Sequence, residues 1–291
     1  MKVFILSLLL LLAQCSSNTP TQRVIDNAEC ALTYDTNEAL FTDSDTLIFG
    51  VNVIYFMNGD SSEYDRDFLE DKLEFVSSLF RPALISFKLL SYSNIEGVPS
   101  DRLVLSNSVR DKLVKYDINN YQFFGMMMNE PHVINIYVYN QPERTAFAGV
   151  AGGIGSDYLA IRKDYFDPPA RTLVHELGHC LGLYHTHQAD ETDGYNIYTG
   201  DKVCDTPAGK SLSGTVDREC NMIKTYDALS DSIQKVNLMS YSYPFCRDSF
   251  TENQVLRMRW FIEQSKDLQS LLYNRHDLIN RKLEEGILNL Q

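Results

Sequence analysis

The residues from His175 to His185 place histidines at a spacing that strongly limits the local fold. The run reads His-Glu-Leu-Gly-His-Cys-Leu-Gly-Leu-Tyr-His. Because an α-helix repeats every 3.6 residues, His175 and His179 project from the same helical face. Gly182 lets the chain leave the helix through a left-handed residue, which turns His185 back toward the other two histidines. The run therefore predicts a helix and a sharp turn, with three imidazoles converging on one point.

Three converging imidazoles are typical of a catalytic zinc site, because they bind Zn²⁺ and leave its fourth position for water. Glu176 directly follows the first histidine, so its carboxylate points beside the metal, where a general base for that water is needed. We therefore expect His175, His179 and His185 to be zinc ligands and Glu176 to be the catalytic base. A buried helix with chance histidines is the competing interpretation, and it leaves the glutamate and the glycine unexplained.

A methionine segment lies well downstream of the histidines. It reads Asn237-Leu-Met-Ser-Tyr241 and contains Met239. The histidine motif followed by such a Met-turn is the metzincin signature. Met239 is expected to form a soft, adaptable floor under the ligands without binding the metal itself.

The chain resembles the pappalysin-type metzincins, the group that includes ulilysin and the pappalysins. Besides the histidine and methionine segments, the resemblance rests on Tyr184-His185-Thr186, Gly200–Pro207, Ser242-Tyr243, Cys246 and Phe250–Met258. It covers roughly residues 132–260. It implies an α+β metzincin fold, in which a twisted mixed β-sheet and the zinc helix form an upper subdomain. An irregular lower subdomain with a C-terminal helix completes it.

The motif and the resemblance together predict a secreted zinc-dependent endopeptidase that hydrolyses extended polypeptides, with its water activated by Glu176. Tyr241 occupies the position at which related metzincins keep a tyrosine near the metal. It either donates a hydrogen bond to the oxyanion of the transition state or makes only a structural hydrogen bond. The alternative function is a non-catalytic zinc-containing surface binding protein or adhesin, which has no need of Glu176.

The residue that controls substrate preference in the family differs here. In the family that this chain resembles, members that prefer a basic residue after the cleaved bond have an acidic residue just before the cysteine that follows the Met-turn. Phe245 occupies this position. Because an aromatic ring cannot pair with arginine as a carboxylate does, we expect an apolar preference instead.

The loop after the third histidine is rich in side-chain oxygens. Ca²⁺ prefers about six to eight oxygen ligands, and relatives bind calcium in this region. The resemblance therefore implies a calcium site that includes Asp201, Asp205 and Thr206. A polar surface loop with turn-forming aspartates is the alternative. The formal net charge of −13 is compatible with calcium binding, and the absence of a basic stripe argues against a nucleic-acid partner.

The first residues have the pattern of a targeting segment. Lys2 precedes an apolar run from Phe4 to Ala13, which is too short to span a bilayer. Residues 1–15 are therefore expected to be a signal peptide. Cys15 ends a segment that resembles a bacterial lipobox, although Gln14 replaces the usual small residue. A lipid anchor at Cys15 and plain cleavage with free secretion both stay open.

The 291 residues are enough for one large domain with a sizeable core. We expect a short pro-segment over residues 16–46 and the catalytic domain over 47–291. Subdomains of about 47–182 and 183–291 are expected within that domain, with the cleft between them. No internal repeat and no low-complexity linker interrupts the chain.

Export permits disulfide bonds, and six cysteines are present. The resemblance implies a bridge between Cys220 and Cys246, which would stiffen the wall of the site. Cys180 and Cys204 are candidates for a second bridge. The competing interpretation makes Cys180 a buried small apolar residue.

Cys30 lies in the expected pro-segment. As the resemblance implies, its thiolate is a candidate for the fourth zinc position, which would hold the enzyme latent. The alternative is an ordinary disulfide from Cys30 to Cys180 or Cys204.

Apolar runs and turn signals predict the remaining elements. Strands are expected over residues 47–56, 85–90, 133–139, 146–151 and 158–161, the fourth as an edge strand. Ser62 is expected to cap a helix whose apolar face contains Leu69, Leu73, Val76 and Phe80.

Two further helix starts are expected. Asp167 with Pro168 marks the start of the zinc helix. Thr251 and Gln254 have the spacing of a capping box for a C-terminal helix.

Overall fold

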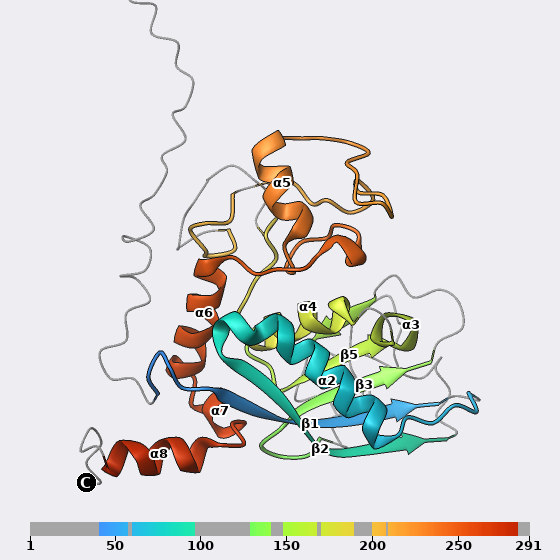
Figure 1. The fold of residues 1–291 in the computed structure, drawn as a ribbon. Helices are drawn as coiled ribbons and strands as arrows, with labels where there is room; N and C mark the ends of the chain where they lie inside the picture. Colours follow the sequence, from blue (N-terminus) through green and yellow to red (C-terminus); the bar gives the residue numbers. More distant parts are fainter. Residues whose placement is uncertain are drawn as a thin grey trace, which may run out of the picture.

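A five-stranded mixed sheet is the centre of the molecule (Figure 1). The computed structural model describes residues 41–57, 60–96, 129–140, 148–167, 170–188, 200–207 and 209–284. The strands are β1 (Leu47–Phe56), β2 (Ile85–Ile95), β3 (Ile134–Tyr139), β4 (Gly149–Ala151) and β5 (Tyr158–Arg162). Their order is β2-β1-β3-β5-β4. All neighbours are parallel except β4, which runs antiparallel to β5 at the edge of the sheet.

The inner strands are buried on both faces, as their continuous apolar sequences predict. All six residues of β3 are buried, and β1 is buried at every position except Ile48. β2 continues to Ile95, beyond the expected end at residue 90, because its partner β1 continues to pair with it as far as Phe56.

The first long helix, α2 (Arg66–Phe80), packs on the sheet through the apolar face that its spacing predicts. Leu69, Leu73, Val76 and Phe80 are all buried. The expected cap at Ser62 is wrong. The carboxylate of Asp65 accepts a hydrogen bond from the backbone N–H of Phe68 (2.8 Å), so the helix begins one residue later, at Arg66. Ser62 instead donates its hydroxyl to Asp60 in the preceding turn.

The helix that carries the histidines also begins later than expected. Asp167 ends the short helix α3 (Lys163–Phe166), and it accepts hydrogen bonds from the hydroxyl of Tyr64 (2.6 Å) and from Lys163 (3.0 Å). The following helix, α4 (Arg171–Cys180), starts after Ala170, whose left-handed φ of 54° turns the chain. The aspartate therefore anchors α3 to the core instead of capping α4.

The C-terminal half contains α5 (Ala228–Val236), α6 (Glu252–Gln264), α7 (Lys266–Ser270) and α8 (Arg275–Glu284). Short 3-10 helices occur at η2 (Arg81–Ala83) and η6 (Pro244–Cys246). The capping box at the start of α6 is confirmed, since Thr251 accepts from the backbone of Gln254 and the Gln254 side chain accepts from Thr251 N–H.

Only part of the C-terminal half lies apart from the sheet. Figure 1 shows α4 between the sheet and the segment around α5. The helices α6 to α8, by contrast, return to the sheet: Met258, Ile262 and Leu268 belong to the same buried cluster as Phe49. The backbone N–H of Tyr273 also donates to the carbonyl of Ile48 (2.6 Å). These helices, which follow residue 182 in the chain, therefore pack against the sheet.

The described chain begins with residues that pack on the domain. Phe41 is buried in the main core, Arg259 donates to the Thr42 carbonyl (2.7 Å), and Asp45 forms an ion pair with Arg281 (2.7 Å). Residues 41–46, the end of the expected pro-segment, thus pack on the domain. Residues 1–40, with Cys15 and Cys30, lie outside the described residues. Within the described part of the chain, none of the helices is both long and apolar enough to cross a membrane.

Candidate active site

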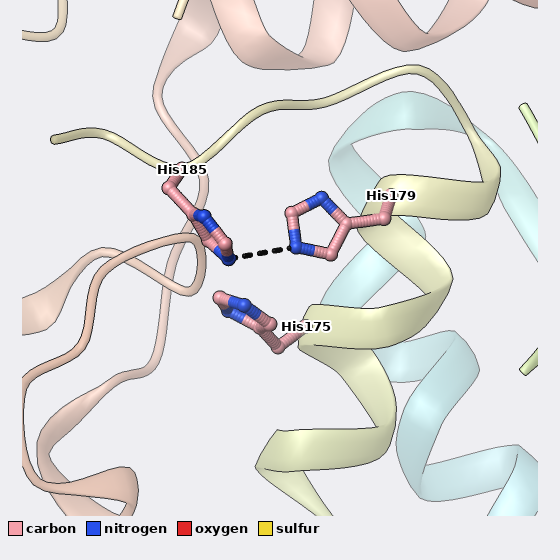
Figure 2. A group of neighbouring side chains, drawn as sticks. All are labelled: His175, His179 and His185. Carbon is pink, nitrogen blue, oxygen red and sulfur yellow. Dashed lines mark hydrogen bonds between the residues drawn. The ribbon is translucent and has the colours of Figure 1, made fainter. Parts of the chain in front are cut away.

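The three histidines of the motif converge in the structure. His175 and His179 project from α4, and His185 points back toward them from the turn that follows the helix (Figure 2). One side-chain nitrogen from each histidine lies within 4.8 Å of the others. The Nε2 atoms of His179 and His185 are 3.0 Å apart. The predicted helix and turn therefore bring all three predicted ligands to one point.

Backbone carbonyls orient the two helical imidazoles. The Nδ1 atoms of His175 and His179 lie 2.7 Å from the carbonyl oxygens of Leu238 and Leu183, respectively. A carbonyl oxygen only accepts, so each Nδ1 carries the proton. Each Nε2 is consequently a free electron-pair donor in the neutral ring, which is the form that binds a metal.

Burial keeps the three rings neutral. It lowers the pKa of His175 well below its ordinary value, that of His179 to about 4 and that of His185 to about 3. Three neutral imidazoles, two of which hold their proton on a carbonyl away from the common point, form a donor set that suits Zn²⁺. His187 is a further neighbour, since its ring stacks on His185 with a centroid separation of 5.0 Å.

Two glycines of the motif permit the close packing around the histidines. Gly182 has a φ of +100°, and a Cβ atom there would lie 2.4 Å from Cγ of Phe261. A Cβ atom on Gly178 would lie 2.5 Å from Sδ of Met239. Met239 is fully buried, so the segment Asn237–Tyr241 packs directly against α4 at Gly178.

Glu176 lies between α4 and the edge strand. Its side chain is buried, and burial raises its pKa to about 8. A hydrogen bond from the backbone of Ala151 and the positive charge of Arg247 act in the opposite direction. The carboxylate thus lines the same cavity as the histidines and is held by β4.

The ring of Tyr241 packs against the histidine cluster. Its ring centroid lies 4.6 Å from that of His185 and 5.8 Å from that of His175. The side chain is 43% exposed. This exposure separates it from a fully buried structural tyrosine and leaves it accessible from the cavity that it lines.

A cavity of about 740 Å³ contains these groups. Its walls come from the edge strand, from α4, from the turn after α4 and from the segment after the Met-turn. The residues that carry its chemistry are His175, Glu176, His179, His185, Tyr241 and Arg247.

Arg247 is the cavity residue that sequence reasoning missed. It is only 5% exposed, and burial lowers its pKa to about 10, so it stays charged at neutral pH. The sequence feature that could have indicated Arg247 is its position directly after Cys246. Phe245, which the resemblance singled out, is 57% exposed and stacks on Tyr243, away from the lining of the cavity.

The three residues expected to bind calcium lie near the start of α6. The Asp201 carboxylate accepts from the Thr206 hydroxyl (2.6 Å) and from the backbone N–H of Val203 (3.1 Å). Asp205 accepts from the Thr251 hydroxyl (2.6 Å) and from the backbone N–H of Asn253 (2.9 Å). These oxygens therefore have internal partners that organise the loop, and burial raises the pKa of Asp201 to about 7.

The cysteines separate into three environments. Cys220 and Cys246 form a disulfide bond. Cys180 is a free, buried thiol, so the candidate bridge between Cys180 and Cys204 is wrong and the apolar interpretation of Cys180 is correct. Cys204 is disulfide-bonded.

Sequence comparisons agree with this geometry. The family model described as pregnancy-associated plasma protein-A matches residues 124–263. An extracellular metalloprotease of Colletotrichum graminicola is 39% identical over 95 residues, which are 32% of this chain and 31% of that protein. Human pappalysin-1 is 31% identical over 123 residues, which are 36% of this chain and 7% of that protein. The match to the fungal relative thus spans about a third of its length.

Solved structures share the fold. Mature mirolysin of Tannerella forsythia, in complex with a cleaved peptide, has a TM-score of 0.54 at 19% identity over 81% of this chain and 99% of that chain. Promirolysin has a TM-score of 0.56 at 18% identity over 89% and 93% of the two chains. The chain therefore matches the pappalysin family model over residues 124–263 and shares the fold of the mirolysin structures.

Proposed function

We propose that this protein is a secreted zinc-dependent endopeptidase that hydrolyses peptide bonds in extended polypeptides. The observation that carries the proposal is the convergence of three neutral imidazoles beside the buried carboxylate of Glu176 in one cavity. His175, His179 and His185 are the zinc ligands. A bound Zn²⁺ supplies a Lewis acid that polarises the scissile carbonyl and acidifies water.

Glu176 performs the proton transfers in this proposal. Its carboxylate accepts a proton from the attacking water and returns it to the nitrogen of the departing amine. A base whose pKa lies near neutrality suits both transfers, and burial moves the pKa of Glu176 in that direction. Tyr241 is the donor proposed for the oxyanion, where its hydrogen bond stabilises charge that develops only in the transition state.

The edge strand supports an extended substrate. β4 is the edge strand of the sheet, next to β5, in the described part of the chain. Its residues Gly149 to Ala151 line the cavity. An extended peptide that adds beside β4 would gain backbone hydrogen bonds and bring its carbonyl to the histidines. A flexible polypeptide, and not a folded surface, is therefore the proposed substrate class.

Replacement of Glu176 tests the proposal. We expect Glu176→Gln to keep full zinc content and to lose about 10²- to 10⁴-fold in kcat/KM on a peptide substrate, because only the base is removed. Glu74→Gln, at an exposed position on α2, is the control and should match wild type. Full activity of zinc-loaded Glu176→Gln would remove Glu176 from the role of catalytic base.

Substitution of His185 tests the ligand assignment. His185→Ala should reduce both zinc content and activity, because two imidazoles hold zinc less tightly than three. Retention of one tightly bound zinc per chain in this variant would remove His185 from the ligand set.

The location outside the cytoplasm is part of the proposal. Relatives are named extracellular metalloproteases, and residues 1–15 have the pattern of a signal peptide. A lipid on Cys15 would instead anchor the protein at the cell surface. The mass of the mature N-terminal peptide, measured from the exported protein, distinguishes the two.

Latency and calcium binding remain proposals at named residues. For latency, the proposed fourth zinc ligand is the thiolate of Cys30, and a Cys30→Ser variant should then be active without removal of the pro-segment. For calcium, the proposed ligands are Asp201, Asp205 and Thr206, of which Asp201 and Thr206 are in direct contact (2.6 Å). Calcium should then raise the melting temperature of wild type and not that of Asp201→Asn.

A further inference from the structure

The third histidine of the cluster, His185, lacks the kind of partner that orients the other two. In His175 and His179 the Nδ1 atom is bound to a backbone carbonyl. Within the described ranges of the chain, Nδ1 of His185 has no hydrogen-bond partner, and the ring's polar contact is from its Nε2 to that of His179 (3.0 Å). A metal-binding imidazole usually has a partner that fixes its ring, so another group must hold His185.

Aromatic rings pack against His185 where a carbonyl is lacking. The ring of His187 is nearly parallel to it, with centroids 5.0 Å apart and an interplanar angle of 11°. The ring of Tyr241 lies edge-on to His185 at 4.6 Å, and its centroid is 4.5 Å from that of His187. Aromatic rings at these separations attract one another, and their contact limits rotation. The three side chains thus form one packed cluster that includes the third histidine.

The backbone fixes His187 in this place. The N–H of Gln188 donates to the carbonyl of His185 (3.0 Å), which closes a turn. Thr186, inside this turn, is buried, and its N–H donates to the carbonyl of Met239 (3.2 Å). The turn is therefore anchored to the methionine segment, and the rings of His185 and His187 stack on one side of it.

His187 supports the set of metal-binding side chains without belonging to it. Among the described residues, the group whose donor atoms lie within 4.8 Å of one another contains His175, His179 and His185. The ring of His175 also lies 5.1 Å from that of His185, but ligands that converge on one point make such a contact in any case. His187 is therefore the histidine whose packing on the third ligand needs a separate explanation.

We propose that His187 is a positioning residue, whose ring holds the imidazole of His185 in the orientation that binds zinc. The inference rests on the zinc site of the proposed function and adds a residue to it. A ligand whose ring is fixed before the metal arrives loses less rotational freedom on binding, so this packing raises the affinity for zinc. The flat shape of the His187 side chain supplies the effect, so a phenylalanine ring can replace it.

Zinc affinity measures the effect without any need for turnover. We expect His187→Ala to raise the dissociation constant for Zn²⁺, measured by competition with a chelator, about 10- to 100-fold, as loss of a group that orients a ligand typically does. His187→Phe keeps a flat ring and should stay close to wild type. His276→Ala removes an exposed histidine on α8 and is the control. Wild-type affinity in His187→Ala, or equal losses in the alanine and phenylalanine variants, would overturn the inference.

The visible spectrum of the Co²⁺-loaded protein gives a second measurement, because it reports the geometry of the ligands around the metal. His187→Ala should change this spectrum, and His187→Phe should restore the wild-type bands. A loss of general stability alone would not produce that pair of results. A wild-type spectrum in His187→Ala would contradict the positioning of His185.

Turnover separates this inference from the proposed function. On a peptide substrate, His187→Ala should need about 10- to 100-fold more free Zn²⁺ for half-maximal activity than wild type, and His187→Phe should not. Zinc binding by wild type with no cutting of peptides or of a denatured protein mixture would overturn the endopeptidase function alone, since the zinc affinities still compare the variants. Normal cutting with equal zinc requirements in wild type and His187→Ala would overturn only this inference.

Discussion

At the scale of single residues, backbone groups orient the polar side chains of the cavity. The Nδ1 atoms of His175 and His179 are bound to carbonyls, which leaves Nε2 for the metal. Glu176 is held by the backbone of Ala151. Arg247 donates to the Ser240 carbonyl and keeps Nε without a partner among the described residues. Each group is thus oriented before a substrate arrives, which lowers the cost of ordering it later.

Gly178 gives a prediction at this scale. Alanine in place of glycine inside a helix usually stabilises by about 1 kcal/mol. Here the new Cβ would lie 2.5 Å from Sδ of the buried Met239, and overpacking of this kind typically costs about 1–3 kcal/mol. We therefore expect Gly178→Ala to lower the free energy of unfolding in denaturant titrations. Adding Met239→Val should recover part of the loss, and a stabilised Gly178→Ala would contradict the packing.

At the scale of elements, local sequence patterns determine some features of the helices and tertiary contacts determine others. The buried face of α2 and the capping box of α6 were predictable, because both depend on residues within a few positions of one another. The cap of α2 was not, since Asp60, Ser62 and Asp65 are all capping residues and the turn held by Asp60 decides among them. The start of α4 depends on Asp167, whose partner Tyr64 is distant in sequence.

The capping box gives a prediction for α6. Thr251→Ala removes the hydroxyl that accepts from the backbone N–H of Gln254 and donates to Asp205. Loss of such a cap costs about 0.5–2 kcal/mol, and we expect the free energy of unfolding to fall by that amount. Thr251→Ser keeps the hydroxyl and should stay close to wild type. Equal losses in the two variants would show that the methyl group and not the cap matters.

Lys72 links α2 to α3 and predicts a pH dependence. Its Nζ donates to the carbonyls of Phe166 (2.8 Å) and Asp167, and burial lowers its pKa from 10.5 to about 8. Between these values the unfolded chain binds a proton that the folded chain does not, so stability from this group rises as pH rises from about 8 to 10.5. Below pH 8 the cost of the buried charge is fully present.

The comparison with Lys72→Met isolates this contribution. We expect the stability of wild type relative to the variant to increase from pH 8 to pH 10.5 in urea titrations. Parallel stability curves for the two proteins over this range would contradict the lowered pKa of Lys72.

At the scale of the whole molecule, long-range folding creates the features that sequence patterns did not contain. The three histidines lie within one helix and its turn, so their spacing sufficed to predict that they converge. Arg247 reaches the cavity because the segment after the Met-turn folds back beside His175, and it neighbours the disulfide between Cys220 and Cys246. The helices α6 to α8 likewise return to the sheet through contacts that no local period encodes.

The cysteines give a prediction at this scale. Burial raises the pKa of the free Cys180 thiol to about 12, and a protonated, buried thiol is a poor nucleophile. We expect iodoacetamide to leave Cys180 unlabelled in the native protein and to label it after unfolding in urea. Peptide mapping of the same non-reduced samples should find Cys220 joined to Cys246. Rapid labelling of Cys180 in the native state would contradict its burial.

The central claim is tested most directly by incubating a denatured protein mixture with the purified protein, before and after removal of residues 1–40. The new N-termini are identified by mass spectrometry with and without a zinc chelator. The account predicts cutting that the chelator abolishes, that added Zn²⁺ restores and that Glu176→Gln lacks. Cutting that resists the chelator, or no cutting by either zinc-loaded form, would contradict it.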